Sequence, residues 1–216
     1  MGRPSRALLS REIIARAALD VVDEQGPDGL TMRTLADRLG VKAASLYNHT
    51  SGKDELIDAL AELVNAEIDL EPLTRTGDAD WRDGVAAYAR GYRAVFLRHP
   101  NTIALLARRR VEAERQLLGY DTLLGALGRA GLGPADAAEA AAALDYLVLG
   151  SALETFTAGF TRGSADYRPR YPALAGALEA SAERGGAPGA GASGLDERGF
   201  ELALRLLLDG LAARTP

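Results

Sequence analysis

Apolar residues recur along most of the chain at intervals of three and four positions, which is the pattern of a helix that buries one face. The alternation of apolar and polar residues that is typical of strands is scarce. We therefore expect an all-α fold. The expected helices span residues 11–25, 32–39, 43–48, 53–69, 81–98, 102–109, 111–131, 135–160 and 196–213.

Capping and helix-breaking residues set the expected boundaries. Ser10 is suited to cap the first helix and Gly26 to end it, whereas Gly40 makes a tight turn between the second and third helices. Pro134 is suited to open the long alanine-rich helix. The stretch 163–194 is rich in Gly, Ala, Pro and Ser and includes GGAPGAGASG, so we expect a flexible loop there.

The composition is that of an ordinary globular protein, with 47% hydrophobic and 25% charged residues. The absence of cysteine excludes disulfides, thiolate metal sites and cysteine nucleophiles. No apolar run reaches the roughly 18–20 residues of a membrane span, and the first residues lack the apolar stretch of a secretory signal. We therefore expect a cytoplasmic protein without a membrane partner.

The net charge of −5 disguises an uneven distribution of charge. Basic residues are spread over the first 53 positions, at Arg3, Arg6, Arg11, Arg16, Arg33, Arg38, Lys42 and Lys53. The acidic residues of this region gather mainly around one turn, at Asp20, Asp23, Glu24 and Asp28. A basic face on an acidic protein is compatible with DNA binding.

The segment 29–56 predicts a helix-turn-helix, in which two short helices meet at Gly40 and the second enters the DNA major groove. A small shared core can form from Leu35, Leu39, Val41 and Leu46. The outward positions of the second of these helices carry side chains that reach phosphates or base edges. The alternative is a helical hairpin in an enzyme, but the chain has no glycine-rich phosphate loop, serine elbow, HExxH or His–carboxylate cluster. We therefore expect no enzymatic activity.

The pattern L-T-x-R-x-L-A-x-x-L-G-V-x-x-x-x-L-Y-x-H-x-x-x-K-x-x-L resembles the DNA-binding domain of TetR-type repressors, over residues 11–63. The resemblance implies that Arg33 reads a base, that Thr31 contacts phosphate, and that Ala43, Ala44 and Ser45 face bases. It also implies phosphate contacts for Tyr47, His49 and Lys53. The full expected DNA-binding set is Thr31, Arg33, Lys42, Ala43, Ala44, Ser45, Tyr47, Asn48, His49 and Lys53.

The later part of the chain is similar to the regulatory domain of the tetracycline repressor subgroup, at residues 92–100, 120–123, 149–154 and 200–211. That subgroup binds a magnesium–drug chelate through histidines on its fourth and sixth helices. The corresponding stretches here read Glu67-Ile-Asp-Leu and Ala104-Leu-Leu-Ala, without histidine. We therefore expect neither a metal nor another cofactor.

The residues left to line a ligand pocket are mostly apolar and aromatic, which suits a small, mostly apolar molecule. The expected set is Tyr88, Tyr92, Phe96, His99, Leu105, Leu106, Leu123, Tyr146, Leu149, Leu153, Glu154 and Phe156. The alternative for the apolar members is plain core packing, and for His99 a role in the turn before Pro100.

These observations predict an N-terminal three-helix helix-turn-helix domain at residues 1–52, a connecting helix at 53–69, and a larger helical bundle at 70–216 for ligand binding and dimerisation. The broad apolar faces of residues 135–160 and 196–213 indicate a homodimer. The expected function is a repressor released from a palindromic double-stranded DNA operator by a small-molecule effector. The alternative is a helix-turn-helix regulator without a small-molecule ligand.

Overall fold

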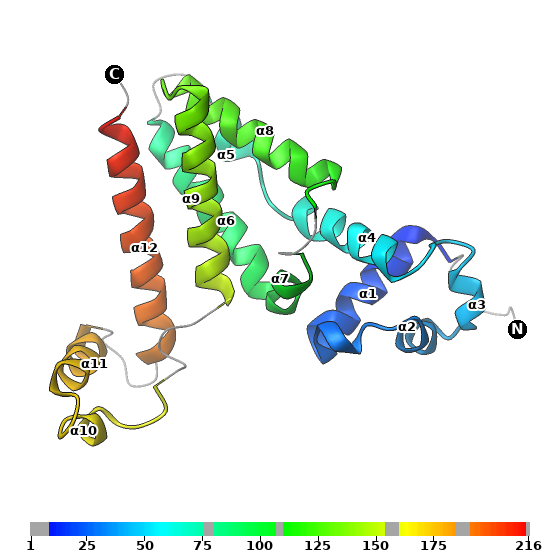
Figure 1. Cartoon of the computed structure of the whole chain (residues 1–216), viewed down its shortest axis with the longest axis horizontal. Coiled ribbons are helices and arrows are strands. Elements are labelled where there is room, and N and C mark those ends of the chain that lie inside the picture. Colours follow the sequence, from blue (N-terminus) through cyan, green and yellow to red (C-terminus); the bar gives the residue numbers. More distant parts are fainter. Residues whose placement is uncertain (1–8, 76–79, 107–109, 154–159, 185–190, 215–216) are drawn as a thin grey trace, which may run out of the picture. The chain divides into compact units, whose positions relative to one another are not determined.

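The computed structural model describes residues 9–75, 80–106, 110–153, 160–184 and 191–214, and within them the fold is entirely helical (Figure 1). The predicted all-α class is therefore confirmed. In chain order the helices are α1 (Arg11–Gln25), the 3₁₀ helix η1 (Pro27–Gly29), α2 (Met32–Leu39), α3 (Ala43–Leu46), α4 (Lys53–Ala66), α5 (Glu71–Thr74), α6 (Trp81–Arg98), α7 (Pro100–Leu106), α8 (Glu114–Arg129), α9 (Pro134–Leu153), α10 (Ser164–Tyr167), α11 (Pro172–Arg184) and α12 (Gly191–Ala212).

The chain divides into two compact units, residues 1–129 and 130–216. In the first, α1 packs against α2, α4 and α7, while α8 contacts α4, α5 and α6. In the second, α12 packs against α9 and α11, and α10 packs against α11. The boundary between these units differs from the boundaries expected after residues 52 and 69. The expected division into a DNA-binding domain, a connecting helix and a ligand-binding domain remains a prediction.

The first helix forms as its sequence pattern predicts. The Ser10 hydroxyl accepts a hydrogen bond from the Ile13 amide at 3.2 Å, which satisfies one of the free N–H groups at the helix start. The buried stripe includes Ala18, Val21 and Val22, none of which has any exposed surface. Since α4 contributes buried Leu60 and Val64, the packing of α1 on α4 forms the central core of this unit.

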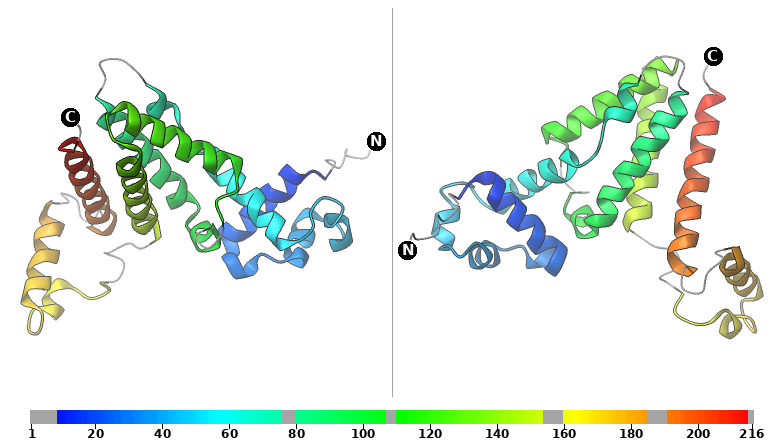
Figure 2. Two further views of the ribbon diagram at one scale, coloured as in Figure 1. Left: turned by 45° about the horizontal axis from the view of Figure 1, so that its top comes forward. Right: turned by 180° about the vertical axis from the view of Figure 1, so that it is seen from behind.

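In the second unit, α9 and α12 run side by side in every view (Figure 2). The face that α9 buries is mostly alanine, with Leu144 and Val148, whereas α12 buries Phe200, Leu204 and Leu208. Small residues on one helix opposite large ones on the other allow close approach. Among the described residues, no helix is both long enough and apolar enough to cross a bilayer.

The expectation of a flexible loop over residues 163–194 is wrong for the part that the structure describes. This part contains α10, α11 and the start of α12. Residues 185–190 lie outside the described residues. Over 172–184 the sequence PALAGALEASAER places Pro172 at the first helical position and is rich in alanine, the best helix former. Ala175 is fully buried, so tertiary packing adds to this local preference.

Candidate nucleic-acid interface and regulatory core

The turn between α2 and α3 has the geometry that the sequence predicts. Gly40 has φ 62° and ψ 35°, in the left-handed region, where a side chain would collide with the backbone. The Gly40 amide donates to the Asp37 carbonyl at 3.2 Å, and the Val41 amide donates to the Ala36 carbonyl at 3.0 Å. These bonds end α2, and only the three residues 40–42 separate it from α3.

The start of α2 is held by two threonines. The Thr31 hydroxyl accepts from the Thr34 amide at 3.1 Å, and the Thr34 hydroxyl oxygen accepts from the Thr31 amide at 3.0 Å. This reciprocal pair is a capping box built with threonine. Beneath it, Leu30, Leu35 and Leu46 have no exposed surface, so they form the small core shared by α2 and α3.

The predicted DNA-binding residues all lie between the start of α2 and the start of α4. Seven are exposed: Thr31, Arg33, Lys42, Ala44, Tyr47, Asn48 and Lys53. Three are half-buried: Ala43, Ser45 and His49. Because α3 ends at Leu46, the residues Tyr47–His49 form a turn rather than the last turn of the expected helix. The fold brings the set together, while the role of each residue remains a prediction.

Arg11 holds the end of this motif in place, a role that the sequence analysis did not find. Its Nε donates to the His49 carbonyl at 3.1 Å, and its Nη2 lies 2.9 Å from Glu55 Oε1. The other Glu55 oxygen accepts from the Ser51 amide at 2.7 Å, and this hydrogen bond is the main reason that the pKa of Glu55 lies below its ordinary value. Arg11 therefore joins α1, the turn after α3 and α4.

A second arginine ties α2 to α1. Arg38 forms an ion pair with Glu24 and has a longer contact, 3.8 Å, with Asp20. The hydrogen bond from Arg38 lowers the pKa of Glu24. These contacts account for two of the acidic residues in the second half of α1, Asp20 and Glu24, because they face a cation of the helix-turn-helix.

The aromatic residues expected to line a ligand pocket form a row along α6. The Tyr88 and Tyr92 ring centroids are 5.8 Å apart, and those of Tyr92 and Phe96 are 5.3 Å apart in an edge-on arrangement. These rings are at most 6% exposed, and Leu123 on α8 is equally buried. Such edge-on and tilted pairs are favourable aromatic geometries. The row therefore belongs to the core of the first unit.

The remaining members of the expected ligand-binding set differ in burial. Leu105 and Leu106 on α7 are half-buried. On α9, in the second unit, Leu149 is half-buried whereas Tyr146 and Leu153 are 77% and 63% exposed. Glu154 and Phe156 lie outside the described residues. The whole set remains a prediction.

His99 stands at the corner between α6 and α7. Its Nδ1 lies 2.7 Å from Asp23 Oδ2 on α1, and its Nε2 lies 3.4 Å from Glu67 Oε1, just after α4. Asn101 adds hydrogen bonds from its Nδ2 to the carbonyls of Val22 (3.0 Å) and Asp23 (3.2 Å). Both carbonyls belong to the last turn of α1, where the Val22 carbonyl also accepts from the Gly26 amide at 2.9 Å. His99 therefore has a structural role in the turn before Pro100. A contact between His99 and a ligand remains a prediction.

Glu67 is shared between this corner and α6. Burial raises the pKa of Glu67, but hydrogen bonding from Arg98 together with the charges of His99 and Arg98 outweighs it, so the pKa lies below the ordinary value. In the part of the chain that the structure describes, no three His, Asp or Glu side chains are grouped to hold a metal ion.

A helix-turn-helix with an exposed second helix, carried on a larger helical body, defines a DNA-binding transcription regulator. Residues 14–60 match the family "Bacterial regulatory proteins, tetR family", and residues 72–215 match "Tetracyclin repressor-like, C-terminal domain". The chain belongs to the TetR family, whose members are transcription regulators rather than enzymes.

Relatives cover nearly the whole chain. The Escherichia coli "Tetracycline repressor protein class A from transposon 1721" is 35% identical over 95% of this chain and 92% of its own length. A solved "possible TetR family transcriptional regulator" of Streptomyces coelicolor A3(2) superimposes with TM-score 0.77 and 33% identity, covering 94% of this chain and 99% of its own. The Streptomyces coelicolor protein ActR, solved with (S)-DNPA, has TM-score 0.72 and 26% identity, covering 97% and 100%.

Proposed function

We propose that this protein is a cytoplasmic, homodimeric repressor that leaves a palindromic operator when a small apolar or aromatic molecule binds. The observation that carries the proposal is the physical connection between the aromatic row of α6 and the DNA-binding helices. Tyr88, Tyr92 and Phe96 lie on the helix that ends at His99, and His99 pairs with Asp23 of α1. The complex of ActR with (S)-DNPA supports a ligand-responsive role.

The connection supplies a route for coupling. A ligand that displaces α6 moves the α6–α7 corner, whose Asn101 side chain binds the last carbonyls of α1. Helix α1 in turn holds α2 through Arg38 and the turn after α3 through Arg11. Ligand binding then changes DNA affinity only if the ligand prefers the conformation that does not fit DNA, typically by about 1–3 kcal/mol.

Dimerisation is proposed through the outer faces of α9 and α12. Large apolar side chains are exposed there, at Tyr146, Leu153, Leu202 and Leu206. Apolar patches of this kind mark interaction surfaces, and two copies of the helix pair make a four-helix bundle. A two-fold dimer presents two recognition helices, so it requires two half-sites.

The alternative is a regulator without a small-molecule ligand. The close packing of the aromatic row, whose side chains are at most 6% exposed, supports this alternative. Two measurements separate the candidates. Selection from random duplex DNA should yield a palindrome. Aromatic compounds are then titrated into the protein–operator complex with and without EDTA.

Release by an aromatic compound in both buffers supports the proposal. Release that needs magnesium contradicts the metal-free mechanism. A compound that binds tightly but leaves DNA affinity unchanged favours the ligand-independent regulator.

A further inference from the structure

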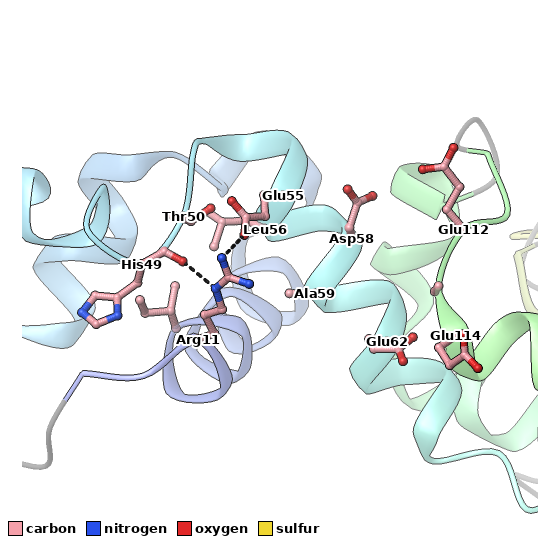
Figure 3. A pocket seen from close by; sticks show the side chains of 12 residues that line it. Arg11, His49, Thr50, Glu55, Leu56, Asp58, Ala59, Glu62, Glu112 and Glu114 are labelled. Carbon is pink, nitrogen blue, oxygen red and sulfur yellow. Dashed lines mark hydrogen bonds and ion pairs between the residues drawn. The ribbon is translucent and has the colours of Figure 1, made fainter.

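A cavity of about 390 Å³ opens between α1, α4 and the N-terminus of α8 (Figure 3). Its lining residues do not include the aromatic row of α6. We call it the α1–α4–α8 cleft. Its apolar lining comes from Ile14, Leu56, Ala59 and Ala113. A volume of this size is in the range of small-molecule sites, which are typically ~300–1,000 Å³.

Carboxylates surround the cleft. Glu55, Asp58 and Glu62 come from α4, while Glu112 and Glu114 come from the start of α8 and the residues before it. The cationic side chains that line it are Arg11 and, when protonated, His49. The lining therefore carries more negative than positive charge, with five carboxylates beside Arg11 and His49. Such an excess of negative charge attracts positively charged ligands.

Glu55, Asp58 and Glu62 each have interactions of their own within the protein. Glu55 binds Arg11 and the Ser51 amide, and Glu62 accepts from the Arg115 amide at 3.1 and 3.3 Å. For Glu112 and Glu114, by contrast, the described part of the chain provides no ion pair. Both side chains are exposed and line the α8 side of the cleft.

The spacing of the charges selects the shape of the ligand. Glu55 and Glu62 are seven residues apart on one face of α4, which separates them by about 10 Å along the helix. The carboxylates do not converge into a group that could hold a metal ion within the described residues. A ligand that neutralises them must carry several positive charges spread along its length.

We propose that the α1–α4–α8 cleft binds an aliphatic polyamine. Its methylene segments lie over the apolar lining formed by Ile14, Leu56 and Ala113, and its ammonium groups face the carboxylates on the two sides. An ammonium group at Glu55 competes with Arg11, which also holds the His49 carbonyl. Binding of a polyamine in the cleft therefore affects the Arg11 contact that holds the end of the helix-turn-helix, independently of any effector at α6.

The test is isothermal titration calorimetry on the full chain without DNA, because polyamines also bind DNA directly. Spermine is the probe, with butylamine and magnesium chloride as single-charge and compact-ion comparisons. We expect saturable binding of one spermine per chain, and no comparable binding of butylamine or magnesium ion. The variant Glu112→Gln/Glu114→Gln should bind spermine about tenfold more weakly, as expected for the loss of two solvent-exposed ion pairs.

The matched control is Asp121→Asn/Glu183→Gln, which removes two exposed carboxylates outside the cleft. It should bind spermine as the wild type does, and circular dichroism should show both variants folded. Equal weakening in the control would mean that spermine responds only to net charge. Unchanged affinity of the cleft variant, or equally tight binding of butylamine, would also overturn the proposal.

Discussion

Asn101→Ala is the sharpest test of the corner that joins α6 and α7 to α1. Asn101 is half-buried, and its amide donates to two carbonyls at the end of α1, those of Val22 and Asp23. Alanine removes both hydrogen bonds without adding charge or bulk. The variant should therefore destabilise the contact between the corner and the DNA-binding helices.

The expected loss follows from the geometry. A typical hydrogen bond contributes about 0.5–1.5 kcal/mol net, so two bonds give about 1–3 kcal/mol. The Val22 carbonyl also accepts from the Gly26 amide at 2.9 Å and keeps that bond in the variant. The lower part of the range, about 1–2 kcal/mol, is therefore expected, which corresponds to a melting temperature roughly 2–8 °C lower for a chain of this size.

The assay is thermal and urea unfolding of the wild type beside Asn101→Ala. Asn65→Ala is the matched control, because within the described residues the Asn65 side chain donates only to the Ala61 carbonyl of its own helix α4, at 2.8 Å. Its loss is offset by the better helix propensity of alanine, about 0.5 kcal/mol or more. If Asn101→Ala proves as stable as this control, the corner does not hold α1 and the coupling route is wrong.

Four further outcomes are expected. Gly40→Ala should lower the free energy of unfolding in urea by about 1–2 kcal/mol, because φ is 62° there; an unchanged midpoint contradicts the turn argument. Leu206→Asp, at a leucine 62% exposed, should give monomers in sedimentation velocity, and a surviving dimer would place the interface elsewhere. The pKa of Glu67 is lowered on folding, so its carboxylate stabilises the fold above the unfolded-state pKa and loses this effect as pH falls through the folded-state pKa. The stability gap between wild type and Glu67→Gln should thus close below about pH 4, and a gap independent of pH would exclude this role. In fluorescence anisotropy, Lys53→Ala should weaken binding to all duplexes and reduce the salt slope by about 1, whereas Arg33→Ala should cost about 1–3 kcal/mol at one base pair; equal losses on every DNA would contradict these roles.

Local interactions account for what the sequence determined by itself. Ser10 caps α1, Gly40 ends α2, and Leu35 and Leu46 are buried, each as predicted. A cap, a turn and a helical stripe depend on residues within about four positions of one another, so the sequence pattern contains the necessary information. The same pattern, together with the family motif, was sufficient for the all-α class and the helix-turn-helix.

At residues 172–184 the sequence predicts a loop, but the structure has a helix. The composition of the whole stretch 163–194 favoured a loop, although 172–184 alone has strong helix formers behind Pro172. An average over a long glycine-rich window concealed a shorter segment with the opposite preference. Buried Ala175 shows that packing also favours the helix.

Only the tertiary structure decided which distant side chains meet. Arg11 and the His49 carbonyl are 38 residues apart, His99 and Asp23 are 76 apart, and the cleft combines α4 with residues 112–114. Helical periodicity shows which face of a helix is buried but not which other helix covers it. The connections between the DNA-binding motif and the regulatory helices therefore come from packing angles and loop paths, and a charged residue on an exposed face carries no local sign of its partner.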